Sequence, residues 1–432
     1  MNGQMEEADK IMIKDKKNET GRNASLHFLN HGYVAFMLKD WSRSNEYFSK
    51  ADQIIEDLQK NYAIDAAALL TNPMIKPYKP EDFEVVMLNY YTALNYINLG
   101  QFDDAMVECK RINNKLNKLN DKYGNKKDRY QHDAFANILM GLIYDADHNY
   151  NDAFIAYRNA YEIYENEYSK YFNEKAPEQL RKDLVRTAYM TGFYEEQEEY
   201  EKQFGFKYDP SSEPQSNLVF IWLNGFGPVK DEWGIDFVII PGAGGVVNFR
   251  NAELGLDFPF VMVDPYSRSS ITDMGILRIA FPKYVERKPY YNAAAIIEND
   301  KQFPLEMAEN VNDIAFKTLH DRMLRELGVS LLRLASKKAV EYVAKKNNPY
   351  LGLAVGIVNA ATEKADTRNW QTLPYSFSYA RVPLMRGTNN FKLKSSTSQG
   401  DSQTYDFTIN AEKGKTYFQS FHNIETIQTA MR

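Results

Sequence analysis

Two histidines stand at a spacing that could bring their side chains together on a metal ion. His27 and His31 are four residues apart, so a helix would place both on one face. A zinc site needs a third ligand, and a zinc peptidase would add the glutamate of the HExxH pattern. Neither accompanies the pair. We therefore interpret both residues as histidines of a structural helix and predict no metal site.

A glycine-rich segment and a single cysteine are the other features that could carry chemistry. Residues 241–245 read PGAGG, without the Lys-Ser/Thr ending of a P-loop or the spacing GxGxxG, so we predict a turn or hairpin. Cys109 has no second cysteine to pair with and occupies a position typical of a buried residue. No GxSxG or SxxK nucleophile pattern occurs. The sequence therefore favours a non-catalytic protein without a cofactor.

The composition fits a folded protein with more than one core. At about 150 residues per domain, a chain of 432 residues predicts two or three domains. The net charge of −6 argues against nucleic-acid binding, which usually requires a basic surface. The longest apolar run, residues 350–361, is shorter than the roughly 20 residues of a membrane span. The polar N-terminus has no signal-peptide pattern.

Residues 135–164 alternate small and aromatic residues at helical spacing. The small residues are Gly141, Ala153 and Ala160, and the aromatic residues are Tyr144, Tyr150 and Tyr157. This pattern is similar to a tetratricopeptide (TPR) unit, a hairpin of two helices in which small residues permit close approach and aromatic rings fill the remaining space. One unit cannot bury its apolar face alone, so we expect stacked copies with a concave surface for a partner.

Two weaker copies of this pattern precede the third. The first has Gly32, Trp41, Ser44, Phe48 and Ala51, and the second has Ala93, Tyr96, Gly100, Phe102 and Ala105. The steps between copies, from Ser44 to Ala105 and on to Ala153, exceed the usual 34 residues, so insertions are expected at 58–80 and 116–129. One further helix, 177–204, is predicted to cap the stack.

The second half of the chain has a different pattern. Short apolar or alternating runs predict strands at 218–223, 237–240, 260–263, 277–281, 375–384, 404–409 and 416–421. Between them, residues 305–346 and 349–364 have helical spacing. The predicted fold is α+β: an N-terminal TPR-like helical repeat domain, then a mixed α+β domain with a helical insertion. The predicted boundaries are a flexible segment 1–24, repeats 25–208, a linker 209–216, the α+β domain 217–385 and a C-terminal β extension 386–432.

Four segments together resemble a known family. They are residues 77–113, 224–230, 276–284 and 365–384, and the last contains ADTRNWQTLP. This resembles an uncharacterised bacterial family of TPR-containing envelope lipoproteins, often encoded beside a penicillin-binding-protein activator lipoprotein. The resemblance implies a periplasmic protein, associated with the outer membrane through a lipidated N-terminus. This chain shows no signal peptide or lipobox cysteine at its start, so membrane contact would require an anchor that it lacks.

Three residues match the signature of that family. They are Arg368, Trp370 and Pro374. We expect structural roles for them: an ion-pair partner, a core aromatic residue and a breaker ahead of a strand, respectively. The resemblance also implies that the partners are other envelope proteins, including lipoproteins. It assigns no catalytic residue.

The leading hypothesis is a scaffold or adaptor that mediates protein–protein interactions in an envelope lipoprotein complex, with a link to peptidoglycan synthesis. Exposed aromatic residues on the repeats would be its contact points, and the candidates are Tyr33, Tyr90 and Tyr91. The alternative is a periplasmic small-molecule or glycan-binding protein with its site in a cleft between the two domains. Trp222, Trp233 and Trp370 would then stack on the ligand.

Overall fold

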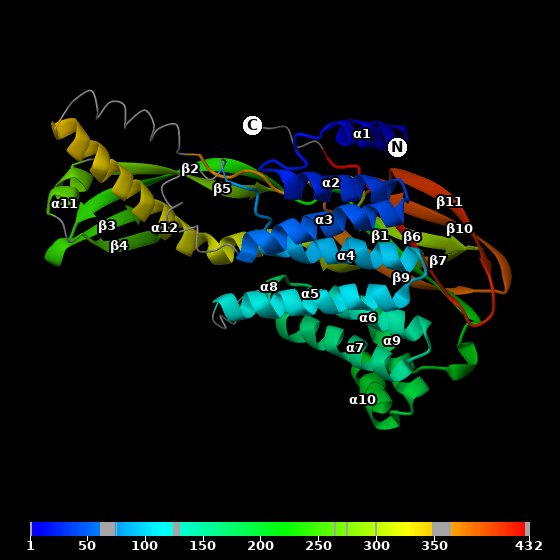
Figure 1. Ribbon diagram of the computed structural model, residues 1–432. Coiled ribbons are helices and arrows are strands. Elements are labelled where there is room, and N and C mark those ends of the chain that lie inside the picture. The colour runs from blue at the N-terminus through cyan, green and yellow to red at the C-terminus, as the bar shows by residue number, and fades with distance from the viewer. Residues whose placement is uncertain are drawn as a thin grey trace.

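The computed structural model describes residues 2–60, 74, 76–123, 130–262, 265–273, 275–298, 300–347 and 364–427. Helices occupy the first half, sheets occupy the second half, and one long helix interrupts the strands (Figure 1), which confirms the predicted fold class. The helices of the first half are α1 (Asn2–Lys14), α2 (Ala24–Met37), α3 (Trp41–Lys60), α4 (Asp82–Asn98), α5 (Phe102–Tyr123), α6 (Ala134–Ala146), α7 (Tyr150–Ile163), the π-helix η4 (Tyr164–Tyr168), α8 (Ser169–Tyr171), α9 (Glu178–Thr191) and α10 (Tyr194–Phe204).

Four helical hairpins share one turn geometry. The pairs α2–α3, α4–α5, α6–α7 and α9–α10 each turn on a residue with positive φ, and these residues are Lys39, Gly100, His148 and Gly192. Two positions later an aromatic residue begins the second helix of each pair, namely Trp41, Phe102, Tyr150 and Tyr194. Within the described ranges, the shared geometry identifies four repeat units, one more than the sequence patterns indicated.

The prediction of one helix over residues 177–204 is therefore wrong, because the structure has two helices there. It divides into α9 and α10 at Gly192, whose φ of 85° is the left-handed conformation that ends a helix. The sequence did carry a signal, because Gly192 precedes Tyr194 as Gly100 precedes Phe102.

Close packing within the hairpins follows from glycine. A Cβ atom on Gly32 of α2 would lie 2.7 Å from the ring of Phe48 in α3, and one on Gly141 of α6 would lie 2.4 Å from the ring of Tyr157 in α7. These distances are too short for any side chain, so each glycine makes room for the aromatic ring of its own hairpin.

The second half forms three four-stranded sheets. Its elements are β1 (Ser216–Asn224), β2 (Val229–Pro241), β3 (Val246–Asn251), β4 (Leu256–Val261), α11 (Pro265–Thr272), β5 (Ile276–Val285), β6 (Ala293–Glu298), β7 (Lys301–Pro304), β8 (Glu306–Asn310), α12 (Val311–Asn347), β9 (Ser376–Leu384), β10 (Gly387–Ser396), β11 (Ser402–Ala411) and β12 (Thr416–Asn423). The strand orders are β12-β1-β9-β8, β11-β10-β6-β7 and β4-β3-β2-β5. The first sheet is called the central sheet below.

Strand β1 shows how the layers stack. Its alternate residues Val219, Ile221 and Leu223 pack with the helices, whereas Leu218, Phe220 and Trp222 pack with residues of β6 and β10. Because successive side chains point to opposite faces, one strand contributes to two cores. The body of the protein is thus three layers: helical hairpins, the central sheet, and the sheet of β10 and β6.

The third sheet extends from this body as an arm together with α11 and α12 (Figure 1). Its inner face carries Ile235, Phe237 and Ile239 of β2, which belong to the same core as Leu327 and Leu331 of α12. The glycine-rich segment 241–245 forms the turn between β2 and β3, as predicted.

The predictions for the two terminal segments of the chain are wrong. The segment 1–24 is not merely flexible, because α1 packs on the first hairpin and Asp9 contacts His31 at 3.0 Å and Arg43 at 2.9 Å. Residues 386–432 are not a separate extension, because β12 pairs in parallel with β1 throughout its length and completes the central sheet.

The predicted helix 305–346 begins later than expected. Its first residues form β8, which pairs with β9, and α12 starts at Val311. The second predicted helix, 349–364, lies outside the described residues except for Lys364.

Candidate protein-interaction surface

The central sheet covers the first helices of the hairpins. Tyr33 in α2 hydrogen-bonds to His422 in β12 at 3.0 Å, and the ring of Tyr90 in α4 stacks on Phe377 in β9, with centroids 5.4 Å apart. In the third unit, Phe135 of α6 also contacts the ring of Phe377. The face on which a concave partner site was expected is therefore filled by the protein's own strands.

This packing overturns the predicted contact residues. Tyr33, Tyr90 and Tyr91 are 1%, 0% and 0% exposed, so they cannot be surface contact points. The physical reason is that aromatic residues at helical spacing on a first helix fill the space between hairpins and sheet. The sequence shows the spacing but gives no information about the sheet that covers it.

The tryptophans proposed for ligand stacking do not form a site either. Trp370 is buried between the rings of Phe48 and Tyr91, at 5.7 and 5.6 Å, and its backbone N–H donates to Glu84 at 2.7 Å. Trp222 is buried between two sheets and donates to Asn423. Trp233 lies half-buried on β2. The helices and the central sheet share one continuous core, and the three rings face no common cleft.

The other signature residues also join distant segments. Arg368 forms an ion pair with Asp366 at 2.6 Å, donates to Asn23 at 2.9 Å, and lies 5.6 Å from the centre of the Tyr78 ring. Pro374 stands two residues ahead of β9. Residues 366–374 thus join the first two hairpins to the start of β9.

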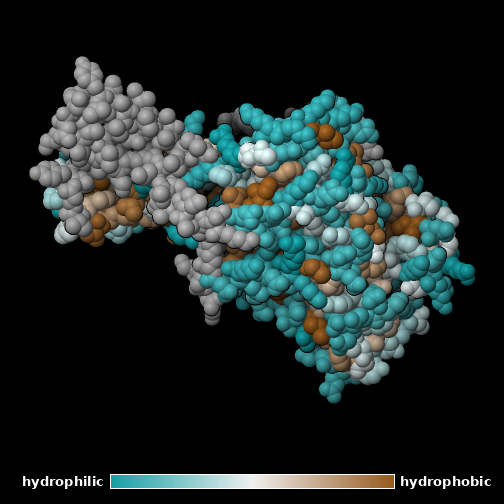
Figure 2. Space-filling view, viewed as in Figure 1, coloured by the Kyte–Doolittle hydropathy of each residue, from teal (hydrophilic) through white to brown (hydrophobic). Residues whose placement is uncertain are grey.

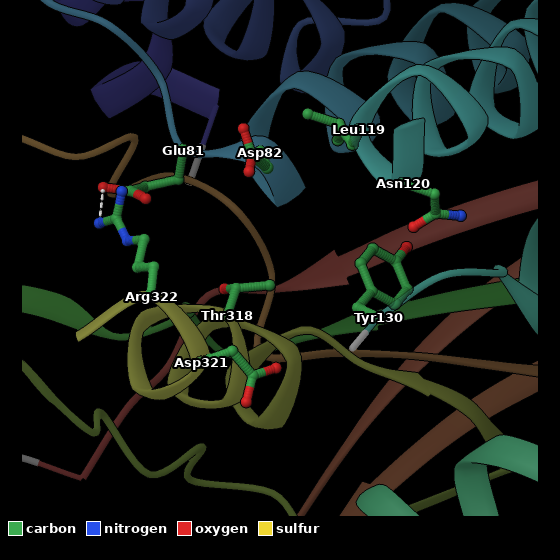
Figure 3. A pocket seen from close by; sticks show the side chains of 8 residues that line it. All are labelled: Glu81, Asp82, Leu119, Asn120, Tyr130, Thr318, Asp321 and Arg322. Carbon is green, nitrogen blue, oxygen red and sulfur yellow. Dashed lines mark hydrogen bonds and ion pairs between the residues drawn. The ribbon is translucent and has the colours of Figure 1, made fainter. Parts of the chain in front are cut away.

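A small cavity lies where α4, α5 and α12 meet, and Figure 3 shows its lining. Glu81 contacts Arg322 at 2.6 Å and also pairs with Lys230 of β2. Burial would raise the pKa of Glu81, but the two cations hold it at about 2. The cavity is small, about 30 Å³, and its wall is held by these ion pairs, so we assign these residues a structural role at the junction of the helices.

A second buried network joins the third and fourth hairpins to β9. Arg381 contacts Asp145 of α6 at 2.5 Å and Asp183 of α9 at 2.8 Å, and Arg186 also pairs with Asp145. Burial opposes ionisation of Asp145, yet the two guanidinium groups hold its pKa below the usual range. All four side chains are nearly or fully buried, which suits a structural role.

A pair of buried carboxyl groups resembles a catalytic dyad in composition. Asp133, which caps α6, accepts hydrogen bonds from Tyr90 and Tyr130, and Glu309 of β8 accepts one from Tyr168 at 3.1 Å. Burial and the charge of Asp133 raise the pKa of Glu309 well above its usual range. Neither carboxyl group has exposed surface. The cluster therefore lies inside the contact between α6 and β8, where it has no opening to a substrate.

The remaining candidates for chemistry are buried or dispersed. His31 contacts Asp9 and stacks on Tyr47 at 3.7 Å, while the centroid of the His27 ring lies 5.8 Å from that of His31. Within the described ranges, no three His, Cys, Asp or Glu side chains are grouped as metal ligands. Cys109 is buried, which raises the pKa of its thiol well above the usual range.

The open surface of the hairpins lies on their second helices. Here a groove of about 410 Å³ runs between α5 and α7, over the start of α6. Its lining is polar and contains Asn113, Asn117, Gln131, His132, Asn137, Asn159, Glu162, Ile163, Asn166 and Glu167. Figure 2 shows that the helical body presents a mostly hydrophilic surface with small separate hydrophobic spots. A partner on this side would be recognised mainly through polar groups.

The walls of this groove are fixed by the core beneath them. In the π-helix η4, Tyr164 and Tyr168 both face inward, where Tyr164 donates to the Ala308 carbonyl and Tyr168 to Glu309. The wider turn of a π-helix leaves Asn166 and Glu167, between these tyrosines, on the groove side. Such local departures from α-helical geometry are frequent at functional sites.

Comparisons with known proteins give a distant likeness in fold. No protein-family model matches the chain, and no curated protein matches it. The apo form of RapI is 18% identical over 41% of this chain and 53% of its own, with a TM-score of 0.28. A tetratricopeptide repeat protein from Parabacteroides merdae ATCC 43184 is 13% identical over 48% of this chain and 60% of its own, with a TM-score of 0.26. Both matches span less than two thirds of the other protein.

Among the described helices, none combines the length with the apolar character that crossing a bilayer requires.

Proposed function

We propose that the protein is a non-catalytic scaffold of the bacterial cell envelope that binds other envelope proteins, including lipoproteins, in a complex linked to peptidoglycan synthesis. The periplasmic, outer-membrane-associated location rests on the resemblance of residues 365–384 and the three other segments to envelope lipoproteins. The interaction role rests on the four TPR-like hairpins.

The observation that carries this proposal is the series of TPR-like hairpins, whose inner face is covered by the central sheet. Because the central sheet occupies that face, the partner is expected on the second helices α3, α5, α7 and α10. The buried networks around Glu81 and Arg381 fix the hairpins to the sheet, so the outer surface is preformed. A preformed surface loses little conformational entropy on binding, which favours a stable complex.

Site-specific photo-crosslinking in native envelopes tests the proposal. A photoreactive amino acid would replace Lys110 of α5 or Ile155 of α7, both exposed one turn from groove residues. The control position is Val261, which is 70% exposed and is the last residue of β4 in the arm. We expect Lys110 and Ile155 to capture the same small set of envelope proteins, which mass spectrometry would identify. Capture of no protein at either position, or the same proteins at Val261, would contradict the proposal.

A further inference from the structure

We propose that the groove between α5 and α7 binds an extended peptide segment of the partner, and that asparagine side chains hold the peptide through its backbone. The inference rests on the proposed scaffold function and specifies what the partner presents. Five of the ten lining residues are asparagines, and Gln131 adds a sixth carboxamide.

The chemistry of the carboxamide suits a peptide backbone. Each asparagine side chain offers an acceptor oxygen and a donor NH₂ group in one plane. These can pair with the N–H and the C=O of an extended residue at the same time. The side-chain amides of Asn113, Asn117, Asn159 and Asn166 make no hydrogen bond to any residue that the structure describes, so these carboxamides are available for a ligand.

The spacing of the asparagines matches an extended chain. Asn113 and Asn117 are four residues apart on α5, which places them about 6 Å apart along the helix axis. Alternate residues of an extended peptide, which point the same way, are about 6.7 Å apart. Asn159 and Asn166 face them from the wall formed by α7 and η4. A strand-like peptide could therefore lie along the groove and pair with both walls.

The charges of the groove specify the peptide further. Glu162 and Glu167 line it, and no lysine or arginine among the described residues does. Glu162 forms only a long, exposed ion pair with Arg158 at 3.9 Å, and His132 hydrogen-bonds to Glu167. We infer that the peptide carries lysine or arginine beside its backbone contacts. The described lining contains no tryptophan, tyrosine or phenylalanine on which a sugar could stack, so a peptide fits better than a glycan.

The test begins with linear peptides selected from a phage-displayed random dodecapeptide library on the purified full chain. Their affinities would then be measured by calorimetry for wild type and for the double variant N113A/N159A. Two lost bidentate contacts should weaken binding about tenfold or more. The matched control is N114A/N151A, which removes exposed asparagines from the same helices outside the groove lining and should leave affinity within about twofold.

A second experiment tests directly whether the backbone of the peptide makes the hydrogen bonds. Selected peptides would be resynthesised with N-methyl groups at alternate residues, which removes donors without changing side chains, and these peptides should lose binding. Thermal unfolding of every variant checks that the fold is intact. Equal affinity for wild type and N113A/N159A, or full binding of the methylated peptides, would overturn the inference.

The outcomes separate this inference from the scaffold proposal. If Lys110 and Ile155 still capture partners while the asparagine variants bind peptides normally, the scaffold function stands and the carboxamide mechanism falls. If neither capture nor peptide binding occurs, both fall.

Discussion

The hydroxyl of Tyr33 and Nδ1 of His422 lie 3.0 Å apart, although 389 positions separate them in the sequence. The Nε2 atom of His422 lies 2.7 Å from the carbonyl oxygen of Gly225, which can only accept a hydrogen bond. Nε2 therefore carries the hydrogen, and Nδ1 accepts from Tyr33. The imidazole can accept from Tyr33 and donate to Gly225 at the same time only while it is neutral.

Because His422 is buried in its neutral form, we expect the unfolding free energy of the protein to fall in mild acid. Burial lowers the pKa of His422 to about 4, compared with about 6.5 in an unfolded chain. The unfolded state thus binds the proton more readily, and folding stability falls as the pH drops from 6.5 toward 4. Between pH 7 and pH 5, wild type should lose about 2 kcal/mol more of its unfolding free energy than His422→Gln. Urea unfolding at both pH values measures this difference, and equal losses would contradict it.

Arg381 should be among the most sensitive positions. Its replacement by Met leaves Asp145 and Asp183 buried with less compensation, which should cost about 3–5 kcal/mol of unfolding free energy. The control is Arg250→Met, because Arg250 forms an exposed ion pair with Asp257 and should change stability by less than about 1 kcal/mol. Similar denaturation midpoints for the two variants would show that the buried network contributes little.

Two glycine-to-alanine changes in helices should have opposite effects. A Cβ on Gly141 would lie 2.4 Å from the Tyr157 ring, so Gly141→Ala should destabilise the protein by about 1–3 kcal/mol. A Cβ on Gly328 in α12 would lie 3.5 Å from Phe258, an ordinary contact. Gly328→Ala should therefore stabilise by about 0.5–1 kcal/mol through helix propensity. Thermal melts of both variants decide the question, and a stable Gly141→Ala protein would refute the packing argument.

Glu174 should weaken the protein at neutral pH. It is buried, and burial raises its pKa to about 8 from 4.5. Below pH 4.5 the Glu174 carboxyl group is protonated in both the folded and the unfolded state, and its burial costs no ionisation free energy. As the pH rises from 4.5 toward 8, only the unfolded state releases the proton, so the unfolding free energy falls. Glu174→Gln should therefore stabilise by up to about 3 kcal/mol at pH 7 and by much less at pH 4.5. The exposed Glu196→Gln serves as the control and should change little at either pH. A gain that does not depend on pH would contradict the assignment to ionisation.

The sequence contains the local features of this fold but few of its long-range contacts. Gly32, Gly141 and the aromatic residues that pack on them recur within single hairpins, so their pattern is visible along the chain. The pairing of β1 with β12 joins segments about 200 residues apart, and no local pattern specifies it. The burial of Tyr90 follows from this distant sheet, which explains why its exposure was predicted wrongly.

The groove shows the same limit. Asn113 and Asn117 are one helical turn apart in the sequence, but the facing row from Asn159 to Asn166 is recognisable only after α5 and α7 have both packed on α6. The π-helix that directs Asn166 outward depends on contacts of Tyr164 and Tyr168 with β8. A sequence pattern alone could not have located this site.

The parallel pairing of β12 with β1 also has a consequence for biosynthesis. The ribosome delivers the hairpins first, and residues 416–423 emerge after all the strands beside which they must lie. Until then β1 presents an open edge, and Tyr33 lacks His422 to cover it. A chain whose translation stops early therefore keeps the exposed features that chaperones and proteases recognise. Strand β12 is therefore the last of the described strands to be made, and the central sheet cannot be completed before it.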